Sequence, residues 1–255
     1  MQHYAVIGFP VAHSRSPEIY AQLFEKYGVE ADFSRISLAP CEIPLLRSVT
    51  SGLSGFAVTM PHKRAVIEHL DSISETARAC GAVNIVERRG NELLGHNTDG
   101  DGMADALAEA GVQLSGQRVF ILGRGGAAVS AAHAVKQRGG EPFFLVRSFG
   151  PDRGFPELLF DEAALAGERC GVFINASPLG MAGLVDFDSF RFLDLLSPSA
   201  VLDMVYLNGT KTRLVSEAAS RGMTTADGSR MLLMQALRAF RIWTGIEASP
   251  SDVIL

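Results

Sequence analysis

Two residues that can handle a proton stand at the ends of separate segments in the first hundred residues. Lys63 ends the segment GFAVTMPHK, and Asp99 lies in the run Asn97-Thr98-Asp99-Gly100. A lysine and an aspartate brought together at a closed site can handle the proton of an alcohol while a dinucleotide takes its hydride. We therefore take Lys63 and Asp99 as the candidate catalytic pair. The alternatives are a solvated surface lysine and an aspartate that only caps a helix.

A glycine-rich turn predicts a dinucleotide site. The turn Gly123-Arg124-Gly125-Gly126-Ala127-Ala128 follows the apolar run Arg118–Leu122 and opens an alanine-rich helical segment. This is the G-x-G-x-x-A form of the dinucleotide fingerprint in its strand–turn–helix setting. Its glycines let the backbone approach a pyrophosphate, and the helix N-terminus supplies N–H donors. The alternative is an ordinary tight turn. The candidate cofactor-binding residues here are Gly123, Arg124, Gly125, Gly126 and Ala127.

The residue that reads the adenine ribose is expected roughly 20 positions after the turn, at the end of the next strand. The sequence there is Val146-Arg147-Ser148, which has no carboxylate to bind the 2′-hydroxyl of NAD. Arg147 and Ser148, reinforced by Arg124, suit a 2′-phosphate through charge-assisted hydrogen bonds. The pattern favours NADP over NAD, unless Arg147 is only a solvated surface residue. Ser177 follows another predicted strand, in a loop where nucleotides bind in such sheets.

Polar side chains elsewhere are candidates for holding a small polar ligand. The hydroxyls of Ser14 and Ser16 project the same way from an extended, proline-bounded loop and could grip a carboxylate. N-capping of the helix that begins at Pro17 explains Ser16 equally well. Gln235 is a lone amide on a largely apolar helix, where the alternative is an amide that faces solvent.

Two further candidates flank the lysine segment in the sequence. Thr59 ends an apolar strand, and Asn84 follows the apolar turn Gly81-Ala82-Val83, where a buried amide needs hydrogen-bond partners. Lys63 begins a predicted helix just after Pro61, where its charge opposes the helix dipole. That unfavourable placement favours a functional role for the lysine. We expect His13 to be a structural hydrogen-bonder, and His62 to be a surface or core residue.

Apolar strands alternate with helical patterns, which indicates parallel-rich sheets covered by helices. In the first part we predict strands at Tyr4–Ile7, Asp32–Leu38 and Gly55–Thr59, helices at Pro17–Tyr27, Ile43–Val49 and from Lys63 to Leu70, and a hairpin of Ala82–Arg88 with Glu92–Gly95. After Thr98 we predict strands at Arg118–Leu122, Pro142–Val146, Val172–Asn175 and Ala200–Asp203, with helices at Asp101–Ala110, Ala127–Gln137, Thr212–Arg221 and Ser229–Gly245.

This segmentation predicts an α/β protein of two domains. Residues 1–98, completed by the C-terminal helix in 229–255, are expected to form an α/β substrate-binding and catalytic domain. Residues 99–228 are expected to form a Rossmann-type, doubly wound domain that binds NADP, with a cleft between the two domains. The polar, broken stretch from Gly150 to Gly171 gives no defined element.

Composition narrows the class of protein. The 255 residues are 47% hydrophobic and 20% charged, as in soluble globular proteins, and the net charge of −5 argues against a nucleic-acid partner. No apolar run approaches the roughly 18 residues of a membrane span, and the N-terminus lacks a secretory signal pattern. Three widely spaced cysteines without metal-ligand spacing fit a reducing cytoplasm and predict no disulfide framework and no metal site.

Taken together, these residues resemble the shikimate dehydrogenase family across essentially the whole chain. The similar blocks are Gly8-Phe9-Pro10, His13-Ser14-Arg15-Ser16-Pro17, Val58 to Lys63, Gly81 to Asn84, Asn97 to Gly100, Gly123 to Ala128, Asn175-Ala176-Ser177, Asp203 to Tyr206, and Asp227-Gly228 through Met231-Leu232 to Gln235. The family fold of two α/β domains with a cleft between them agrees with the segmentation above.

The resemblance implies NADP-dependent interconversion of 3-dehydroshikimate and shikimate, a step of aromatic amino acid biosynthesis, with Lys63 and Asp99 as the catalytic pair. Ser14 and Ser16 would hold the carboxylate of this cyclic polyol, and Tyr206 would lie close by. The Asp227-Gly228 block adds Gly228 to the cofactor-binding candidates. The ring hydroxyls would be held by Thr59, Lys63, Asn84, Asp99 and Gln235. We expect a cytoplasmic monomer or homodimer.

Three departures from the family pattern leave the substrate open. Ala57 stands where the family usually has asparagine, Tyr20-Ala21 replaces a His-Asn pair, and Val146-Arg147-Ser148 replaces an Asn-Arg-Thr clamp whose second arginine is offset to Arg153. Losing one substrate hydrogen bond costs roughly 0.5–1.5 kcal/mol, enough to change substrate preference. The alternatives are a paralogue that acts on quinate or a related compound with NAD or NADP, and a non-catalytic NADP-binding regulator.

Overall fold

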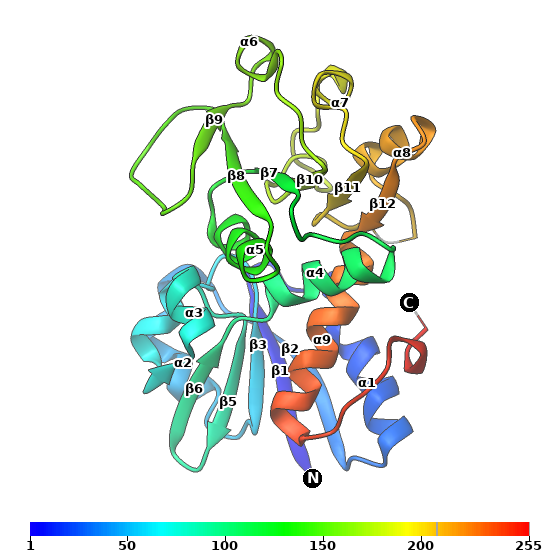
Figure 1. Ribbon diagram of the computed structural model, residues 1–255. Helices are drawn as coiled ribbons and strands as arrows, with labels where there is room; N and C mark the ends of the chain where they lie inside the picture. Colours follow the sequence, from blue (N-terminus) through cyan, green and yellow to red (C-terminus); the bar gives the residue numbers. More distant parts are fainter. Residues whose placement is uncertain (208, 255) are drawn as a thin grey trace. The chain divides into compact units, whose positions relative to one another are not determined.

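The computed structural model describes residues 1–207 and 209–254, and its contacts divide the chain into two compact units (Figure 1). Unit 1 comprises Met1–Thr98 and the C-terminal stretch from Gln235, and unit 2 comprises Asp99–Met234. The chain returns from unit 2 to unit 1 between Met234 and Gln235, inside the last long helix. The sequence predicted this return before the helix, between residues 228 and 229. No helix in the described part of the chain combines the length and the apolar character of a membrane span.

Unit 1 is built on a mixed six-stranded sheet in the order β2-β1-β3-β5-β6-β4. Strands β1, β2 and β3 are parallel, whereas β5 runs antiparallel to β3 and to β6. The predicted hairpin is confirmed, and its two-residue loop begins at Gly90, whose positive φ of 62° suits glycine. The strands are β1 Gln2–Gly8, β2 Ala31–Ser37, β3 Gly55–Val58, β4 Ser72–Ile73, β5 Ile85–Arg89 and β6 Glu92–His96.

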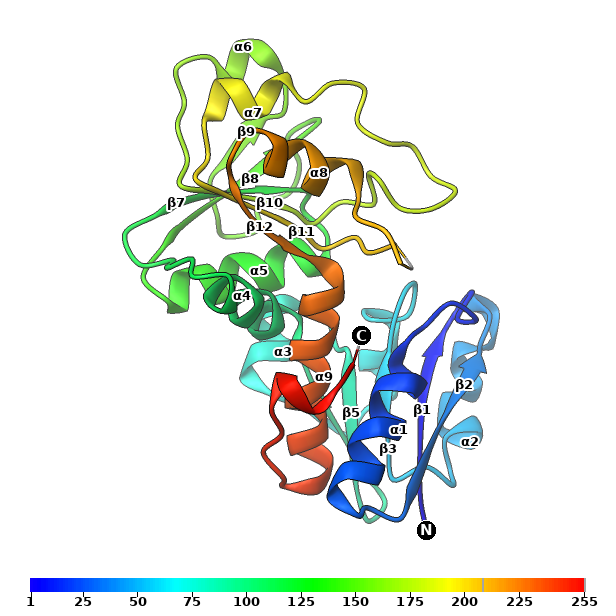
Figure 2. The same cartoon turned by 90° about the vertical axis from the view of Figure 1, so that its right-hand side faces the viewer.

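Helices cover both faces of this sheet. On one face α1 (Ser16–Tyr27) lies beside the C-terminal half of α9 (Gly228–Thr244) (Figure 2). Tyr20 and Phe24 of α1 form tilted ring contacts with Trp243 and Phe240 of α9. The opposite face is apolar and is covered by η1 Pro40–Leu45, α2 Leu46–Val49, η2 Ala65–His69 and α3 Glu75–Cys80. The short η3, Pro250–Asp252, contacts α1 through a 2.6 Å hydrogen bond from Tyr27 to Asp252.

The helix predicted to begin at Lys63 is wrong in type and in start. Residues 61–64 form a turn, and only Ala65–His69 is helical, as the 3₁₀-helix η2. The i→i+3 bond from the Ile67 amide to the Arg64 carbonyl sets this tighter winding, which stays short because its bond geometry is poorer than that of an α-helix. The dipole argument for Lys63 therefore does not hold, since so short a helix has little dipole.

Unit 2 is a parallel six-stranded sheet in the order β12-β11-β10-β7-β8-β9. Counted along the unit, this is the doubly wound dinucleotide-binding order 3-2-1-4-5-6 read from its other edge, so the predicted Rossmann-type fold is confirmed. The strands are β7 Arg118–Leu122, β8 Glu141–Val146, β9 Glu157–Leu159, β10 Val172–Asn175, β11 Ala200–Asp203 and β12 Thr224–Asp227. The direction of winding switches between β7 and β10.

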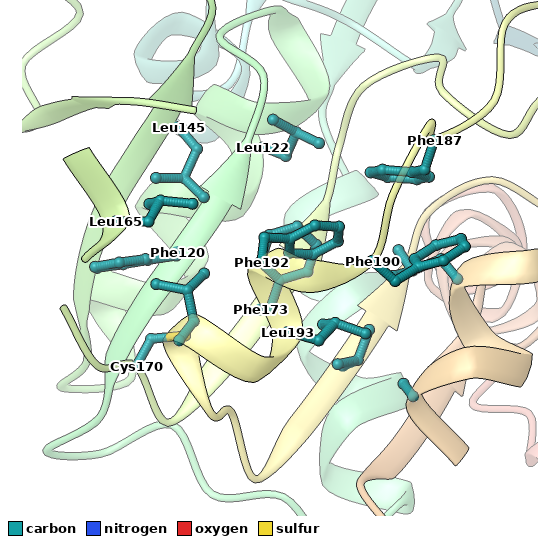
Figure 3. Packing of buried hydrophobic residues seen from close by; sticks show 14 residues of the cluster. Phe120, Leu122, Leu145, Leu165, Cys170, Phe173, Phe187, Phe190, Phe192 and Leu193 are labelled. Atoms are coloured by element: carbon teal, nitrogen blue, oxygen red, sulfur yellow. The ribbon is translucent and has the colours of Figure 1, made fainter. Parts of the chain in front are cut away.

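Both faces of this second sheet are also covered. The helices α4 (Asp99–Glu109) and α5 (Gly126–Gln137) lie on one side in both ribbon views. On the other side a phenylalanine-rich core joins the sheet to α6 (Glu162–Leu165), α7 (Arg191–Leu196) and α8 (Arg213–Ser220) (Figure 3). Its aromatic members include Phe120 and Phe173 of the sheet and Phe192 of α7. Two buried faces explain why the central strands are continuous apolar runs.

Candidate functional site

A buried polar cluster in unit 1 joins three segments that are far apart in the sequence. The Asn84 amide nitrogen donates to Thr98 Oγ1 and to Gln235 Oε1, at 2.9 Å each. The Thr98 backbone N–H donates to Asn84 Oδ1 at 2.8 Å. Gln235, which is partly buried, thus directs its Oε1 to Asn84, and Asn84 has the partners that a residue only 2% exposed requires.

The sheet fixes Asn84 from its backbone. Its carbonyl accepts from the Val58 N–H at 2.7 Å, and its own N–H donates to the His96 carbonyl at 3.0 Å. These bonds extend the β3–β5–β6 pairing by one residue, so Asn84 projects from the point where β5 begins. The side chain of Asn84 is thus held at a rigid sheet position rather than on a mobile loop.

Aromatic packing places Gln235 on the other side of the cluster. Trp243 lies on the sheet and donates to the Val86 carbonyl at 3.0 Å, in space that Gly55 leaves open, since a Cβ there would lie 2.5 Å from the indole nitrogen. Tyr20 donates to the carbonyl of Ala236, the residue after Gln235, at 3.4 Å. Burial raises the pKa of Tyr20, so this donor stays protonated.

The two serines of the loop before α1 lie together as predicted. Ser14 Oγ is 3.2 Å from Ser16 Oγ and also accepts from the Ser16 backbone N–H. The capping alternative for Ser16 is excluded, because α1 begins at Ser16 and its N-cap, Arg15, makes no side-chain capping bond. The guanidinium of Arg35 on β2 donates two bonds to the Ser14 carbonyl, at 2.6 and 3.0 Å, and so holds the loop.

Thr59 and Lys63 lie in the segment that follows β3. The Thr59 N–H donates to the Ile7 carbonyl, and its methyl group packs on Gly8, where a Cβ would lie 2.4 Å away. The Lys63 carbonyl accepts from the Val83 N–H at 2.7 Å, which ties the lysine backbone to the residue before Asn84. His62 is buried and contacts the Leu38 carbonyl, so of the two expected alternatives it is a core residue and not a surface one.

Asp99 is the first residue of α4 and is 4% exposed. It directly follows Thr98 of the polar cluster, and the next residue, Gly100, donates from its backbone to Ser130 Oγ at 2.8 Å. A Cβ on Gly100 would lie 2.3 Å from the Ser130 carbonyl, so glycine allows α4 to approach α5. Lys63 belongs to unit 1 and Asp99 to unit 2, and the pairing of their side chains stays a prediction.

The glycine-rich turn in unit 2 has the geometry that a pyrophosphate needs. Gly123 has a φ of 112°, and a Cβ on it would lie 3.2 Å from the carbonyl of Ala176, which follows β10. Gly125 is the N-cap of α5 without a side-chain capping bond, and a Cβ on it would meet no atom within 4 Å. The N-cap glycine therefore offers no side-chain acceptor to the first N–H groups of α5, from Gly126 and Ala127, which lie at the switch point of the sheet.

The residues expected at the adenine ribose differ in their surroundings. Arg147 and Ser148 follow β8 and are exposed. Arg124 instead forms an ion pair with Glu157, Nη2 to Oε1, at 2.9 Å. Ser177 lies in a turn after β10, where its hydroxyl donates to Asn175 Oδ1 at 2.7 Å. The structure therefore brings these candidates to the carboxyl edge of one sheet and leaves Arg147 the more accessible cation.

Tyr206 and Gly228 belong to neighbouring strand ends of unit 2. Tyr206 follows β11 and is partly exposed. Gly228 begins α9 directly after β12, and a Cβ on it would lie 2.5 Å from the Met204 carbonyl and 2.7 Å from that of Val205. Glycine is thus required here for the backbone of α9 to pass the segment that carries Tyr206.

Substituting Gly228→Ala should lower the free energy of unfolding by about 1–3 kcal/mol, because the added methyl group overlaps two backbone carbonyls that cannot rotate away. Urea unfolding followed by circular dichroism measures this change. Gly52→Ala is the matched control, since a Cβ there meets nothing within 4 Å. Equal free energies of unfolding for the two variants would show that the backbone at residues 204–205 moves to accommodate the methyl group without loss of stability.

Comparison with known proteins identifies the family. The family model for the shikimate dehydrogenase substrate binding domain matches residues 6–86, which include the Ser14–Ser16 pair, Thr59, Lys63 and Asn84. The shikimate dehydrogenase (NADP(+)) of Thermococcus kodakarensis is 37% identical over 254 residues, covering 96% of this chain and 91% of that protein. The chain belongs to the shikimate dehydrogenase family. The corresponding enzyme of Rubrobacter xylanophilus is 38% identical and covers 95% of the chain and 90% of its own length.

Solved structures of the family share the fold. Shikimate dehydrogenase 1 from Peptoclostridium difficile aligns with a TM-score of 0.88 at 28% identity, covering 98% of this chain and 94% of that one. Shikimate 5-dehydrogenase from Thermus thermophilus, solved with NADP(H) and shikimate, aligns with a TM-score of 0.85 at 31% identity, covering 99% and 97%. Family membership thus agrees with the resemblance found in the sequence.

Sequence reasoning missed three residues that shape these sites. Thr98 was quoted within a block but not chosen, although its hydroxyl and N–H both bind Asn84. Arg35 and Glu157 carried no local signal, because each acts on a residue in another element. Only Thr98 could have been found from the sequence, as a small hydroxyl residue directly before the buried Asp99.

Proposed function

We propose that this protein is an NADP-dependent oxidoreductase that interconverts 3-dehydroshikimate and shikimate. The observation that carries the proposal is the buried cluster of Asn84, Thr98 and Gln235 in a chain 37% identical to a named shikimate dehydrogenase over nearly its whole length. A shikimate 5-dehydrogenase of the same fold was solved with both shikimate and NADP(H). The substrate is thus a small cyclic polyol carboxylate.

The roles we propose for unit 1 follow from donor and acceptor chemistry. The paired hydroxyls of Ser14 and Ser16 can donate to a carboxylate, and the Arg35 guanidinium keeps their loop in place. Thr59, Asn84 and Gln235 offer a hydroxyl and two amides, groups that can both donate to and accept from ring hydroxyls. We propose that Tyr206 also contacts the substrate.

For the cofactor, we propose that the start of α5 and the Gly123–Ala127 turn hold the pyrophosphate of NADP. Arg147 and Ser148 suit the 2′-phosphate, and Ser177 and Gly228 complete the cofactor-binding set. When bound, NADP supplies the hydride acceptor for alcohol oxidation. The open space before Gly125 and the positive φ of Gly123 fit this group.

Lys63 and Asp99 are the proposed catalytic pair. In the reducing direction the Lys63 ammonium donates a proton to the alkoxide oxygen that forms from the ring ketone. The Asp99 carboxylate orients the lysine in this proposal. In the oxidising direction the Lys63 amine accepts the proton of the ring hydroxyl.

A spectrophotometric panel tests this proposal. Purified protein is assayed with shikimate and with quinate, each with NADP and with NAD, by the absorbance of the reduced nicotinamide. We expect the highest kcat/KM for shikimate with NADP. Reduction with quinate but not with shikimate would replace the proposed substrate, and no reduction in any combination would point to a non-catalytic NADP-binding regulator.

One observation supports a second candidate, a dehydrogenase for quinate or a related compound. Ala57 is 8% exposed on the strand face that continues to Thr59, so the amide that the family usually carries there is replaced by a small apolar group. A shikimate 5-dehydrogenase from Listeria monocytogenes, 30% identical, was solved with shikimate and NAD. NAD is therefore one of the two cofactors assayed in the spectrophotometric panel. The cytoplasmic location, the oligomeric state and the cleft stay predictions from the sequence.

A further inference from the structure

An ion pair in unit 2 crosses the edge of the sheet where the adenine ribose is expected. Arg124 follows β7, Glu157 is the first residue of β9, and β8 lies between these two strands. The 2.9 Å contact between Arg124 Nη2 and Glu157 Oε1 must therefore pass β8 near its carboxyl end. The second strand of a doubly wound sheet is the one whose end reads the ribose 2′ position.

The surrounding loop is built around this guanidinium. Arg124 Nη2 also donates to the Pro151 carbonyl, which lies in the segment between β8 and β9. A Cβ on Gly150 would lie 1.7 Å from Arg124 Nη1, so a larger residue there would displace the guanidinium from its present position. The side chains of Arg124 and Glu157 are 24% and 12% exposed, which makes this a partly buried pair rather than a surface contact.

The pair does not use all of its hydrogen-bonding groups. Among the described residues, neither Arg124 Nε nor Glu157 Oε1 has an aligned hydrogen-bond partner, so Oε1 meets the guanidinium as an ion and not in a well-directed bond. A guanidinium has five N–H donors in a planar fork that matches phosphate oxygens. Arg124 Nε is buried, so the N–H donors that can meet an anion are those of the terminal nitrogens, on a side chain that is 24% exposed and is held by Glu157 and Pro151.

Charge at this edge depends on both partners. A carboxylate near the ribose favours the 2′-hydroxyl of NAD and repels a 2′-phosphate, whereas an arginine favours the phosphate. Glu157 brings such a carboxylate to the edge, and Arg124 neutralises it. Arg153, the offset arginine of the clamp, is exposed.

We infer that Arg124 and Glu157 together set the selectivity for NADP over NAD. This inference rests on the proposed NADP-dependent function. Arg124 supplies the second cation for the 2′-phosphate beside Arg147, and it masks a carboxylate that would otherwise oppose that phosphate. Removing the charge of Arg124 should therefore weaken binding of a ribose 2′-phosphate, whereas removing the charge of Glu157 should strengthen it.

Binding of 2′,5′-ADP and of 5′-AMP, measured by titration calorimetry, tests the inference without turnover. Arg124→Met keeps the length of the side chain and should weaken 2′,5′-ADP roughly ten- to hundredfold, while 5′-AMP changes less than about threefold. Glu157→Gln should tighten 2′,5′-ADP about two- to fivefold, because a repelling charge is lost. The double variant should bind 2′,5′-ADP better than Arg124→Met alone.

Several outcomes would overturn the inference. Equal weakening of both nucleotides by Arg124→Met would mean that the arginine only supports the loop. Weaker 2′,5′-ADP binding by Glu157→Gln would contradict the repulsion, and this variant keeps the test decisive if Arg124→Met does not fold. Failure of the proposed function would be distinguishable from failure of this inference. A wild-type protein that prefers 2′,5′-ADP to 5′-AMP but does not reduce NADP with shikimate would contradict the proposed function, and the binding of the variants would still test the inference.

Discussion

Replacing Lys63 with methionine should lower kcat for shikimate oxidation by roughly a hundred- to ten-thousandfold, the range for a lost general acid–base group. The KM for shikimate should change far less, because the paired serines and the Asn84 cluster retain their donors. The backbone at Lys63 is held by the bond from Val83 to its carbonyl, so the substitution removes the ammonium without removing that support.

Steady-state kinetics with NADP measure this effect, and Lys136→Met, an exposed lysine of α5, is the matched control. A fall in kcat below about tenfold with a large rise in KM would assign Lys63 to ground-state binding instead.

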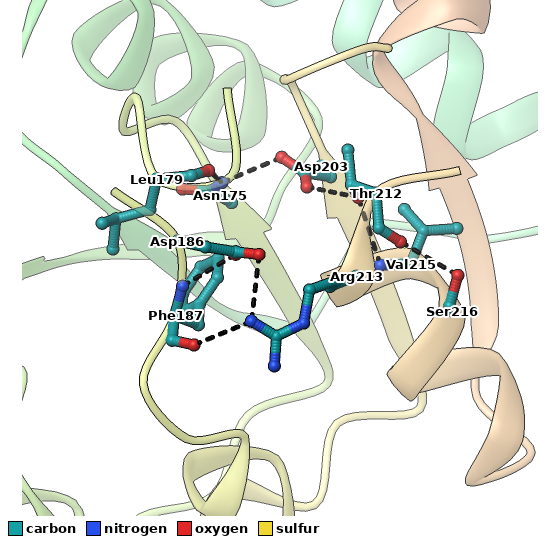
Figure 4. A network of polar contacts seen from close by, with 9 residues as sticks. All are labelled: Asn175, Leu179, Asp186, Phe187, Asp203, Thr212, Arg213, Val215 and Ser216. Atoms are coloured by element: carbon teal, nitrogen blue, oxygen red, sulfur yellow. Dashed lines mark hydrogen bonds and ion pairs between the residues drawn. The ribbon is translucent and has the colours of Figure 1, made fainter. Parts of the chain in front are cut away.

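Asp203→Asn should stabilise unit 2 relative to wild type by an amount that grows with pH. Asp203 ends β11, is fully buried, and accepts from Asn175 at 2.9 Å and from Thr212 at 2.7 Å (Figure 4). It also accepts from the Val205 N–H at 3.0 Å. Burial raises the pKa of Asp203 to about 6 from 3.8, against the lowering effect of these bonds. The folded state therefore prefers the protonated carboxyl.

The sign of this effect follows from linkage. The stability contributed by the raised pKa is fully present below the unfolded value of 3.8 and is lost as the pH rises through about 6. At neutral pH the loss amounts to about 3 kcal/mol, since each pKa unit corresponds to about 1.4 kcal/mol. Asparagine does not titrate, so it keeps one acceptor for Asn175 and Val205 without this loss.

Urea unfolding of both proteins at about pH 4 and about pH 7 checks the prediction, which is a change of about 2 kcal/mol in their difference between the two pH values, because part of the loss has already occurred at about pH 4. Asp194→Asn is the control, because its carboxylate is 64% exposed and pairs with Arg221 at the surface. A difference that does not vary with pH would mean that Asp203 is charged in the folded protein throughout this range.

The central elements were predictable because burial leaves a local signal. Strands β7 and β10 coincide with the predicted Arg118–Leu122 and Val172–Asn175, since parallel strands covered on both faces are continuous apolar runs. The edge strands β9 and β12 were missed, because an edge strand is less buried and the sequence of β12, TTAD, has no apolar run. The 3₁₀ winding after Lys63 was also missed, since it depends on the turn before it.

Chemistry carried by contiguous residues was likewise visible in the sequence. The glycine-rich turn, the serine pair and the lysine segment depend on neighbours a few positions away, so residue type and spacing were enough to select them. Family membership follows from the order of such blocks along the chain. The assignment of a dinucleotide fold needed only the turn and its flanking elements.

The contacts that assemble the sites were decided by tertiary structure alone. The bond from Asn84 to Gln235 joins residues 151 positions apart. Arg124 and Glu157 pair across the end of β8, which lies between β7 and β9 in the sheet. Amides and charges look alike in sequence whether they face solvent or a partner. Their partners are set by strand order and helix packing, which arise from the burial of many apolar side chains at once.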